Sequence, residues 1–383
     1  MLAIIPFLAC YVTWTVANSV SADFDCTISV QYKVGDLMEP QPLLLKRDGK
    51  RATIWYPDND NGTLKILAGD SIYLACPGKD NYLKNRSWGN EVKAVCVEGK
   101  VFDVNGVHQY FSSLVCKYHA EHHAKYTDSP PCLGRHSPIE VGFNVSGTFI
   151  RTIELCRDEK TYRTYYTKFK MTKMIGSYQR SYPRPSKFLA GKFYPGIDID
   201  YLYKFETQLD TLARILDSDE LAKERLKKSV QFLSRGHMAA KADFVYGAQQ
   251  RSTFWYLNTA PQWQSFNGGN WNFLEISVRR FAASRRLDLD VYTGVHGQMT
   301  MEDIRGKQQP VYLHAEGTVM SVPKFYWKVI YDPLSKRDIS EGIKWLDWRP
   351  RNITSGISYA CSVADLRKAV PVVPLLDVIG ILM

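Results

Sequence analysis

The first 22 residues contain no acidic or basic side chain, and they are mostly apolar as far as Val16. This apolar run is shorter than the ~20 residues that a membrane-spanning helix needs. The small residues Val20, Ser21 and Ala22 follow it, in the pattern of a secretory cleavage site. We therefore predict a signal peptide over residues 1–22 and a secreted, extracellular protein without a membrane segment.

Cysteine is scarce in most of the chain, since only one lies beyond residue 160. Seven remain once Cys10 is removed with the signal peptide: Cys26, Cys76, Cys96, Cys116, Cys132, Cys156 and Cys361. In an oxidising compartment they are expected to form disulfides, with one thiol left over or paired between chains, and the sequence leaves the pairing open. Four glycosylation sequons agree with a secreted glycoprotein, at Asn61, Asn85, Asn144 and Asn352.

The chain shows no internal repeat and no low-complexity tract, but its character changes once. Residues 23–135 alternate short β-type runs with turn clusters, which predicts a small, disulfide-stapled, mostly β domain. The proline- and glycine-rich segment 129–138 is typical of a linker, so we place the boundary there, before a mixed α and β domain over 136–383. Leucines at helical spacing over 209–233 predict helix, with Ser218 as a candidate cap. The apolar tail 369–383 contains prolines and Asp377, which favour a buried strand or packed terminus.

Positive charge exceeds negative charge, with a formal net charge of +10. Such a balance suits a polyanionic partner, either nucleic acid or a heparin-like sugar. The segment 161–187 has seven Lys or Arg, no Asp or Glu, and six aromatic residues. This mixture suits a nucleic-acid surface, because basic groups neutralise phosphates and aromatic rings stack on bases. The equal alternative is an amphipathic β-ribbon with a solvated basic face.

Two polar clusters have an ordinary structural explanation. His119, His122 and His123 lie between Cys116 and Cys132 without any zinc-protease motif, which favours a solvated loop over a metal site. The acidic pair in residues 197–200, Ile-Asp-Ile-Asp, is explained by alternation in a strand as well as by cation binding.

The segment Ser234-Arg235-Gly236-His237 raises a sharper question, because a histidine in this position is either a core residue or a base. A β-type run follows at 252–257, then an expected turn at 258–262. A helix is expected to open after Gly268 and Gly269. The predicted order is therefore a strand, a turn carrying the histidine, a second strand and a helix, with polar residues where the elements meet.

This region resembles the DNA/RNA non-specific endonuclease family, which carries Asp-Arg-Gly-His and, downstream, Asn-x-x-Pro-Gln and Asn-x-Gly-x-Trp-x-x-Leu-Glu. The matching positions are Ser234 to His237, Asn258 with Pro261 and Gln262, and then Asn267, Gly269, Trp271, Leu274 and Glu275. The resemblance covers roughly residues 140–383 and implies an α+β fold, with a ββα-metal nuclease core in a mixed α/β domain. The cysteine-rich N-terminal region is similar to that of the secreted arthropod branch, which includes salivary nucleases of blood-feeding insects.

The resemblance also implies a role for each matched residue. His237 would be the general base, whose ordinary pKa near ~6.5 predicts activity that rises through that pH. Asn267 would ligate one Mg²⁺, or Mn²⁺ in its place, and Glu275 would orient the waters of that ion. Arg279 would hold the scissile phosphate, while Arg235 and Asn258 would support the site. The expected substrates are DNA and RNA, both double- and single-stranded.

Ser234 departs from the family, which has Asp at this position in many members. Serine keeps a hydrogen-bonding group but loses the charge. The favoured hypothesis is therefore a secreted, Mg²⁺-dependent endonuclease with little sequence preference. The alternative is a secreted protein that binds nucleic acid tightly and cleaves it weakly.

Overall fold

The computed structural model describes residues 24–84, 88–344 and 357–382. The predicted signal peptide and the sequons at Asn85 and Asn352 lie outside the described residues. The other two sequon asparagines, Asn61 and Asn144, are exposed.

The N-terminal region consists of two small antiparallel sheets. The first pairs β1 (Cys26–Ser29) with β4 (Thr63–Ile66). The second has six strands in the order β3-β2-β5-β6-β7-β8. Their bounds are β2 Leu43–Asp48, β3 Arg51–Ile54, β5 Ser71–Ala75, β6 Glu91–Glu98, β7 Val101–Val104 and β8 Val107–Tyr110. The disulfides Cys26–Cys96 and Cys76–Cys116 link these strands and their loops, which confirms a disulfide-stapled β region.

A nine-stranded sheet organises the rest of the chain, in the order β22-β21-β20-β15-β12-β11-β10-β9 with β23 added beside β21. The bounds are β9 His123–Tyr126, β10 Ser137–Val145, β11 Thr148–Asp158, β12 Arg163–Met171, β15 Leu289–His296, β20 Phe325–Asp332, β21 Arg337–Lys344, β22 Ile357–Cys361 and β23 Gly380–Ile381. The segment predicted as a linker connects β9 to β10, and Cys132 within it is bonded to Cys156 of β11. The large sheet therefore begins before residue 135. Cys361 takes no part in the three disulfides.

Side chains alternate between the two faces of this sheet, as the pleat requires. In β20, Trp327 and Val329 pack against α7 (Val363–Ala369). Lys328, between them in sequence, points to the opposite face, where its ammonium lies 5.3 Å from the ring centre of Trp271. The apolar tail is packed only in part: Val370, Val373 and Leu382 are buried, whereas Leu375, Ile379 and the β23 residue Ile381 are exposed.

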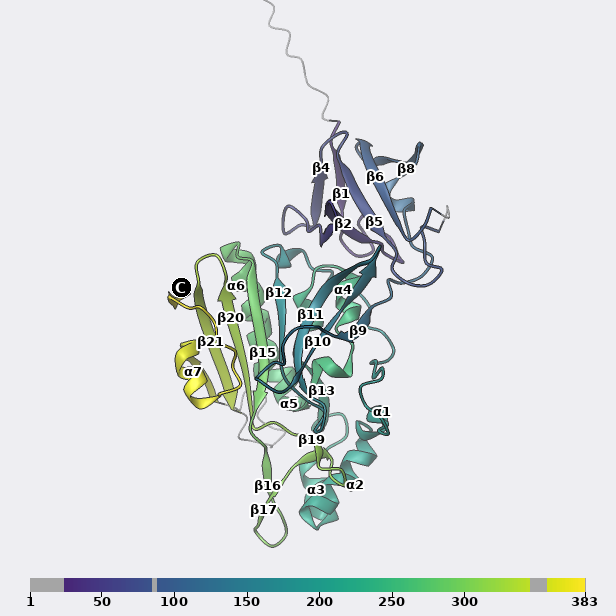
Figure 1. The fold of residues 1–383 in the computed structure, drawn as a ribbon. Coiled ribbons are helices and arrows are strands. Elements are labelled where there is room, and N and C mark those ends of the chain that lie inside the picture. The colour runs from purple at the N-terminus through teal and green to yellow at the C-terminus, as the bar shows by residue number, and fades with distance from the viewer. Residues whose placement is uncertain (1–23, 85–87, 345–356, 383) are drawn as a thin grey trace, which may run out of the picture.

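Short helices and hairpins surround the sheet (Figure 1). The helices are α1 Ile199–Leu202, α2 Phe205–Leu216, α3 Asp219–Arg225 and α4 Gly247–Ser252. The hairpins are β16 Thr300–Glu302 with β17 Gln308–Pro310, and β18 Tyr312–His314 with β19 Val319–Ser321. Ser218 accepts a hydrogen bond from the Leu221 amide at the start of α3, so the predicted cap is confirmed. The β16–β17 hairpin and the N-terminal sheets lie at opposite ends of the molecule.

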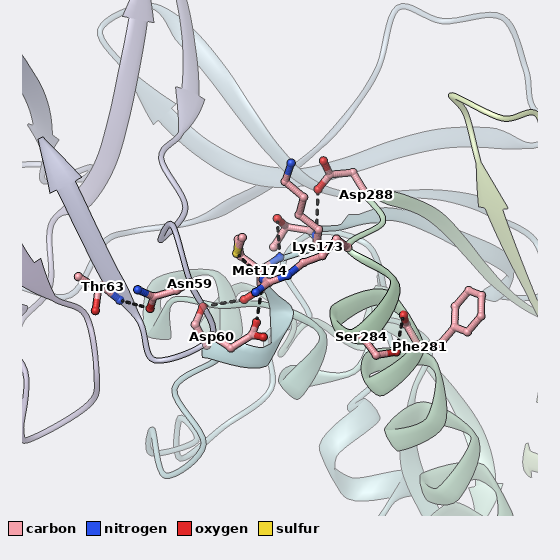
Figure 2. Close-up of polar contacts among 11 residues, drawn as sticks. Asn59, Asp60, Thr63, Lys173, Met174, Phe281, Ser284 and Asp288 are labelled. Atoms are coloured by element: carbon pink, nitrogen blue, oxygen red, sulfur yellow. Dashed lines mark hydrogen bonds and ion pairs between the residues drawn. The ribbon is translucent and has the colours of Figure 1, made fainter.

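The loop after β3 belongs to the N-terminal region and makes side-chain contacts with the large domain. Figure 2 shows Asp60 on this loop, reaching toward Met174 and the start of the segment that follows β12. Arg286, at the end of the long helix α6 (Asn272–Arg285), donates to Asp60 at 3.4 Å and to the Met174 sulfur at 3.3 Å. Tyr246 and Gln249, around α4, also donate hydrogen bonds to Trp55 and Tyr56. The two regions therefore share a polar seam as well as a continuous apolar core.

Across the described residues, every helix is too short or too polar to span a lipid bilayer.

Candidate active site

A two-stranded hairpin carries the residues of the central motif. β13 (Leu233–His237) pairs antiparallel with β14 (Thr259–Trp263), so that Ser234 faces Gln262 and His237 faces Thr259. The segment 258–262, predicted as a turn, is therefore mostly strand. The run 252–257, predicted as strand, instead contains the end of α4, a single bridge at Trp255 and the start of a 3-10 turn.

A long helical segment follows the hairpin directly, which completes a ββα arrangement. It begins with α5 (Gln264–Phe266), continues through a π-type turn at Asn267–Trp271 and becomes α6 (Asn272–Arg285). The helix therefore starts before the glycine pair and not after it. Gly269 leaves helical geometry, with φ −100° and ψ −117°, and kinks the chain between Asn267 and Glu275.

His237 ends β13 in an aromatic environment. Its ring lies 5.2 Å from that of Phe188 and 4.9 Å from that of Phe254, measured between centres. Burial lowers the pKa of His237 to about 4, and the positive charge of Lys241 acts in the same direction. Its Nε2 atom is buried and has no hydrogen-bond partner among the described residues. The imidazole is thus neutral near pH 7, with a nitrogen that can accept a proton.

Asn258 is fully buried and fixes the backbone just after His237. Its side-chain oxygen accepts from the Ala239 amide at 2.9 Å, and its nitrogen donates to the carbonyls of Ala239 and Thr253. Its own carbonyl accepts from the Met238 amide. All these bonds are internal, so this side chain holds the loop between the two strands.

Ser234 connects the hairpin to the helix that follows it. Its hydroxyl donates to the Gln262 carbonyl at 2.8 Å and accepts from Asn267 Nδ2 at 3.1 Å. With the nitrogen of the Asn267 amide held in this way, Oδ1 is the atom left for another partner. An amide oxygen is a suitable ligand for a hard cation such as Mg²⁺, so the donor set fits a site of one protein ligand completed by waters.

Four charged groups form one cluster: Glu275 and Arg279 of α6, Lys328 of β20, and Asp243. Arg279 donates to Asp243 at 2.8 Å in a buried ion pair. Burial raises the pKa of Glu275 to about 7, helped by the negative charge of Asp243 and opposed by Lys328 and Arg279. Burial likewise lowers the pKa of Lys328, whose ammonium donates to Thr293 Oγ1 at 2.6 Å. Two acids and two bases therefore share one poorly solvated cluster.

Arg235 is held by groups outside the hairpin. Its Nε donates to the Tyr256 hydroxyl at 2.9 Å and its Nη2 to Asp200 at 3.2 Å. Tyr256 also donates to Asp200, so the three side chains form one network. Phe188 lies 5.7 Å from the guanidinium and also contacts His237, which places the two motif residues around a shared ring.

Several groups at this site were not found from the sequence. Asp243 and Lys328 had no recognised role, although a lysine within the apolar strand sequence Phe-Tyr-Trp-Lys-Val-Ile-Tyr is an available signal. For the acidic pair at 197–200 the sequence left strand alternation and cation binding open; Asp200 instead lies in α1, and Asp198 caps that helix by accepting from the Tyr201 amide. Their link to the site depends on tertiary contacts that no local pattern reveals.

The three histidines near residue 120 each contact a different partner. His122 accepts a hydrogen bond from Trp255 Nε1 at 2.9 Å. His119 lies 3.5 Å from Glu39, and His123 lies 3.7 Å from Glu121. No group of three or more His, Cys, Asp or Glu side chains with metal-binding geometry occurs in the described part of the chain. The predicted solvated loop therefore holds for His119, which is exposed, but not for His122, which packs against Phe143 and Trp255.

The basic and aromatic segment 161–187 divides between core and surface. Its first part is β12, in the middle of the large sheet, where Lys168 is 3.4 Å from Asp290 and Phe169 is buried. Its second part is a loop in which Lys173, Arg180, Arg184 and Lys187 are exposed. Lys170, near the end of β12, is exposed as well, so most of the solvent-exposed charges of the segment lie in the loop and at the end of the strand that leads to it.

A family model for DNA/RNA non-specific endonucleases matches residues 137–370, which contain all the residues of this site. The chain belongs to this family. It is therefore an endonuclease, its substrates are nucleic acids, and the family is one of metal-dependent nucleases. The ββα core predicted from the motif is confirmed.

Curated relatives extend the similarity beyond the family model. A salivary endonuclease of Lutzomyia longipalpis is 29% identical over 315 residues, covering 82% of this chain and 70% of that protein. The salivary protein Tsal2A of Glossina morsitans morsitans is 24% identical and covers 79% and 74%. A salivary endonuclease of Culex quinquefasciatus is 24% identical, covering 80% and 72%. A crystal structure of the EndoG/EndoGI complex aligns with a TM-score of 0.36 and 20% identity over 60% of this chain and 87% of that one.

Proposed function

We propose that this nuclease is a secreted salivary glycoprotein that hydrolyses DNA and RNA, single- or double-stranded, with little sequence preference and with Mg²⁺ as its metal. The salivary relatives support the proposed location, and the apolar start of the chain agrees with secretion. The observation that carries the catalytic part is the bond between Ser234 and Asn267, which ties the strand of the histidine to the candidate metal ligand.

In this proposal His237 is the general base. Its neutral imidazole accepts the proton of the attacking water at Nε2, the buried atom without a partner. Phe188 and Phe254 hold the ring in place and exclude competing solvent. Asn258 fixes the chain after the histidine and acts as a positioning residue.

Asn267 Oδ1 would hold the metal, and Glu275 would orient the waters of that ion. When bound, the ion neutralises charge at the phosphate and at the departing 3′ oxygen. Arg279 is placed by Asp243 and keeps other guanidinium donors for the scissile phosphate. Arg235, braced by Tyr256 and Asp200, supports the motif strand.

The alternative, a binding protein with weak cleavage, has less support. Its motivation is Ser234, but this residue makes two good hydrogen bonds within the site. Two of the relatives described above are also named endonucleases.

Digestion of plasmid DNA and of RNA, in Mg²⁺ and in EDTA, tests the proposal with His237→Ala. We expect cleavage to fall by about 10²–10⁴-fold, the usual contribution of a general base, and binding to stay nearly unchanged. The matched control is His108→Ala, since His108 is exposed on β8. Equal loss of binding and cleavage in His237→Ala would show that the histidine is not the base.

A further inference from the structure

A hollow of about 360 Å³ lies where the N-terminal region meets the nuclease domain. Gln31, Tyr32, Asp60 and Asn61 line one side of it, and residues 176–181 line the other. Asn61 is also a sequon asparagine, so a subsite here requires that it carries no glycan and assigns glycosylation to other sequons such as the exposed Asn144. We propose that this hollow is a second substrate subsite, in which the N-terminal region binds the nucleic-acid strand beyond the scissile phosphate. The inference rests on the proposed function, and it assigns a role to a region that lies outside the matched nuclease family model.

Each side of the hollow contributes a tyrosine with a cation over its ring. Lys33 Nζ lies 5.6 Å from the ring centre of Tyr32, and the Arg180 guanidinium lies 5.5 Å from that of Tyr178. Both cations are exposed, and neither forms an ion pair with a described residue. Aromatic rings stack on bases of any sequence, and the adjacent cations neutralise phosphates. The pairing suits a strand bound without sequence preference.

The hollow is connected to the catalytic residues by the segment 178–182. On one side of this segment, the Tyr178 ring lies 5.9 Å from the Arg279 guanidinium, which is paired with Asp243. Farther along, the Tyr182 carbonyl accepts a hydrogen bond from Lys241, whose charge acts on His237. A nucleic-acid strand bound at the active site therefore lies next to the hollow.

The two walls are fixed to each other before any ligand binds. Gln179 Nε2 donates to the Val30 carbonyl at 2.6 Å, and the Tyr182 hydroxyl donates to Glu39 at 2.9 Å. The rings of Tyr32 and Tyr182 meet edge to face at 5.0 Å. A preformed site loses little conformational entropy when it binds.

The local charge also favours a phosphate backbone. Asp60 is the acidic residue in the lining, and Arg286 pairs with it at 3.4 Å, so its charge is offset. Figure 2 shows this aspartate on its loop beside Met174. Arg180, which lines the hollow, and Lys33, the exposed residue after Tyr32, then make the charge around it positive.

The test measures binding in the His237→Ala background, so that Mg²⁺ can be present without cleavage. Single strands of DNA and of RNA, about 12 and about 4 nucleotides long, span the usual range of single-strand site sizes. The test variant carries Lys33→Gln with Arg180→Gln. The matched control carries Lys93→Gln with Lys307→Gln, two exposed lysines on β6 and in the β16–β17 hairpin.

We expect the test variant to bind the longer strand about tenfold more weakly, and its salt slope to be less steep by about 1.4, or roughly 0.7 for each lost phosphate contact. Binding of the shorter oligonucleotide should weaken less. Comparison of the DNA and RNA measurements identifies which nucleic acid occupies the hollow. Tyr32→Leu tests the stacking surface in the same assay, with thermal unfolding as a check on folding.

A test variant that matches the control in both the dissociation constant and the salt slope would overturn the inference. Cleavage by the unmodified protein is measured separately in Mg²⁺. If that protein does not cleave, the proposed function fails whatever the binding result. If it cleaves while the test variant matches the control, only the second subsite fails.

Discussion

At the scale of single residues, burial shifts the pKa values of His237 and Glu275 in opposite directions, so that the glutamate titrates at a higher pH than the histidine. Burial lowers the pKa of the histidine to about 4 and raises that of the glutamate to about 7. With its pKa at about 4, this imidazole is neutral in mild acid, so we expect the activity profile to depend on another group than the histidine with its ordinary pKa. The carboxylate is the group that changes charge near neutral pH.

We predict that cleavage rises with pH as Glu275 ionises, because the carboxylate must be charged to orient the metal-bound waters; a bound cation favours that charge and should place the rise below the pKa of about 7 that burial gives. The carboxylate is present above its pKa and protonated below it, so the activity falls on the acid side. Glu275→Gln should lower the rate and remove this rise, whereas Glu275→Asp should keep a rise at a different pH. Profiles of kcat/KM against pH decide the matter, and an unchanged rise in Glu275→Gln would contradict the assignment.

Ser234 supports a second prediction at this scale. An aspartate there can accept the bond from Asn267, but its carboxylate has no proton to donate to the Gln262 carbonyl. Since the position is only 9% exposed, the charge would face that carbonyl with little solvent. We expect Ser234→Asp to lower the free energy of unfolding by about 1–3 kcal/mol without raising cleavage.

Ser234→Thr is the matched control, because threonine keeps the hydroxyl and suits a strand. Chemical denaturation and a plasmid assay measure the two effects. A clear gain in cleavage by Ser234→Asp would instead indicate that the missing carboxylate limits this enzyme.

At the scale of elements, the hairpin requires glycine at position 236. A Cβ built there would lie 2.2 Å from Gln262 Oε1 and 2.6 Å from its Cβ, across the paired strand. Gln262 is itself buried, so it has little room to move. We expect Gly236→Ala to destabilise the protein by about 1–3 kcal/mol and to reduce cleavage by displacing His237.

Gly268→Ala serves as the folding control, because its Cβ would meet nothing closer than 3.4 Å. Its stability should stay within about 1 kcal/mol of the unmodified protein. If the two alanine variants unfold at the same denaturant concentration, the close approach at Gly236 does not constrain the hairpin.

The same elements show what the sequence can and cannot predict. The motif and its spacing predicted His237, Asn267 and Glu275 as site residues, and the structure confirms the ββα order of the elements that carry them. The bounds of the second strand were wrong, because Pro261 suggested a turn. A strand of a two-stranded hairpin tolerates proline, and here the Pro261 carbonyl also accepts a hydrogen bond from Tyr326. Lys328 was not recognised, since its partners Thr293, Asp243 and Glu275 lie far from it in the sequence.

At the scale of the whole molecule, His122 belongs to the seam between the N-terminal region and the nuclease domain. Its ring meets those of Phe143 and Trp255 edge-on, and its Nδ1 accepts the Trp255 indole proton. Burial lowers its pKa to about 4, and the charges of Arg251 and His123 act in the same direction. The contact between the two regions therefore includes a histidine that is neutral in the folded protein.

This arrangement predicts that the fold weakens in acid. Below about pH 6.5 an unfolded chain protonates this histidine, whereas the folded chain resists protonation until about pH 4. The unfolded state binds more protons within that window, so the free energy of unfolding falls as the pH falls, by up to about 3 kcal/mol for one such histidine.

His122→Gln keeps an acceptor for Trp255 but does not titrate, and it should make the decline between pH 6.5 and 4 less steep. His108→Gln, on an exposed histidine, should leave the decline unchanged. Urea unfolding at several pH values measures both slopes, and equal slopes for His122→Gln and the unmodified protein would mean that the seam does not sense pH through this residue.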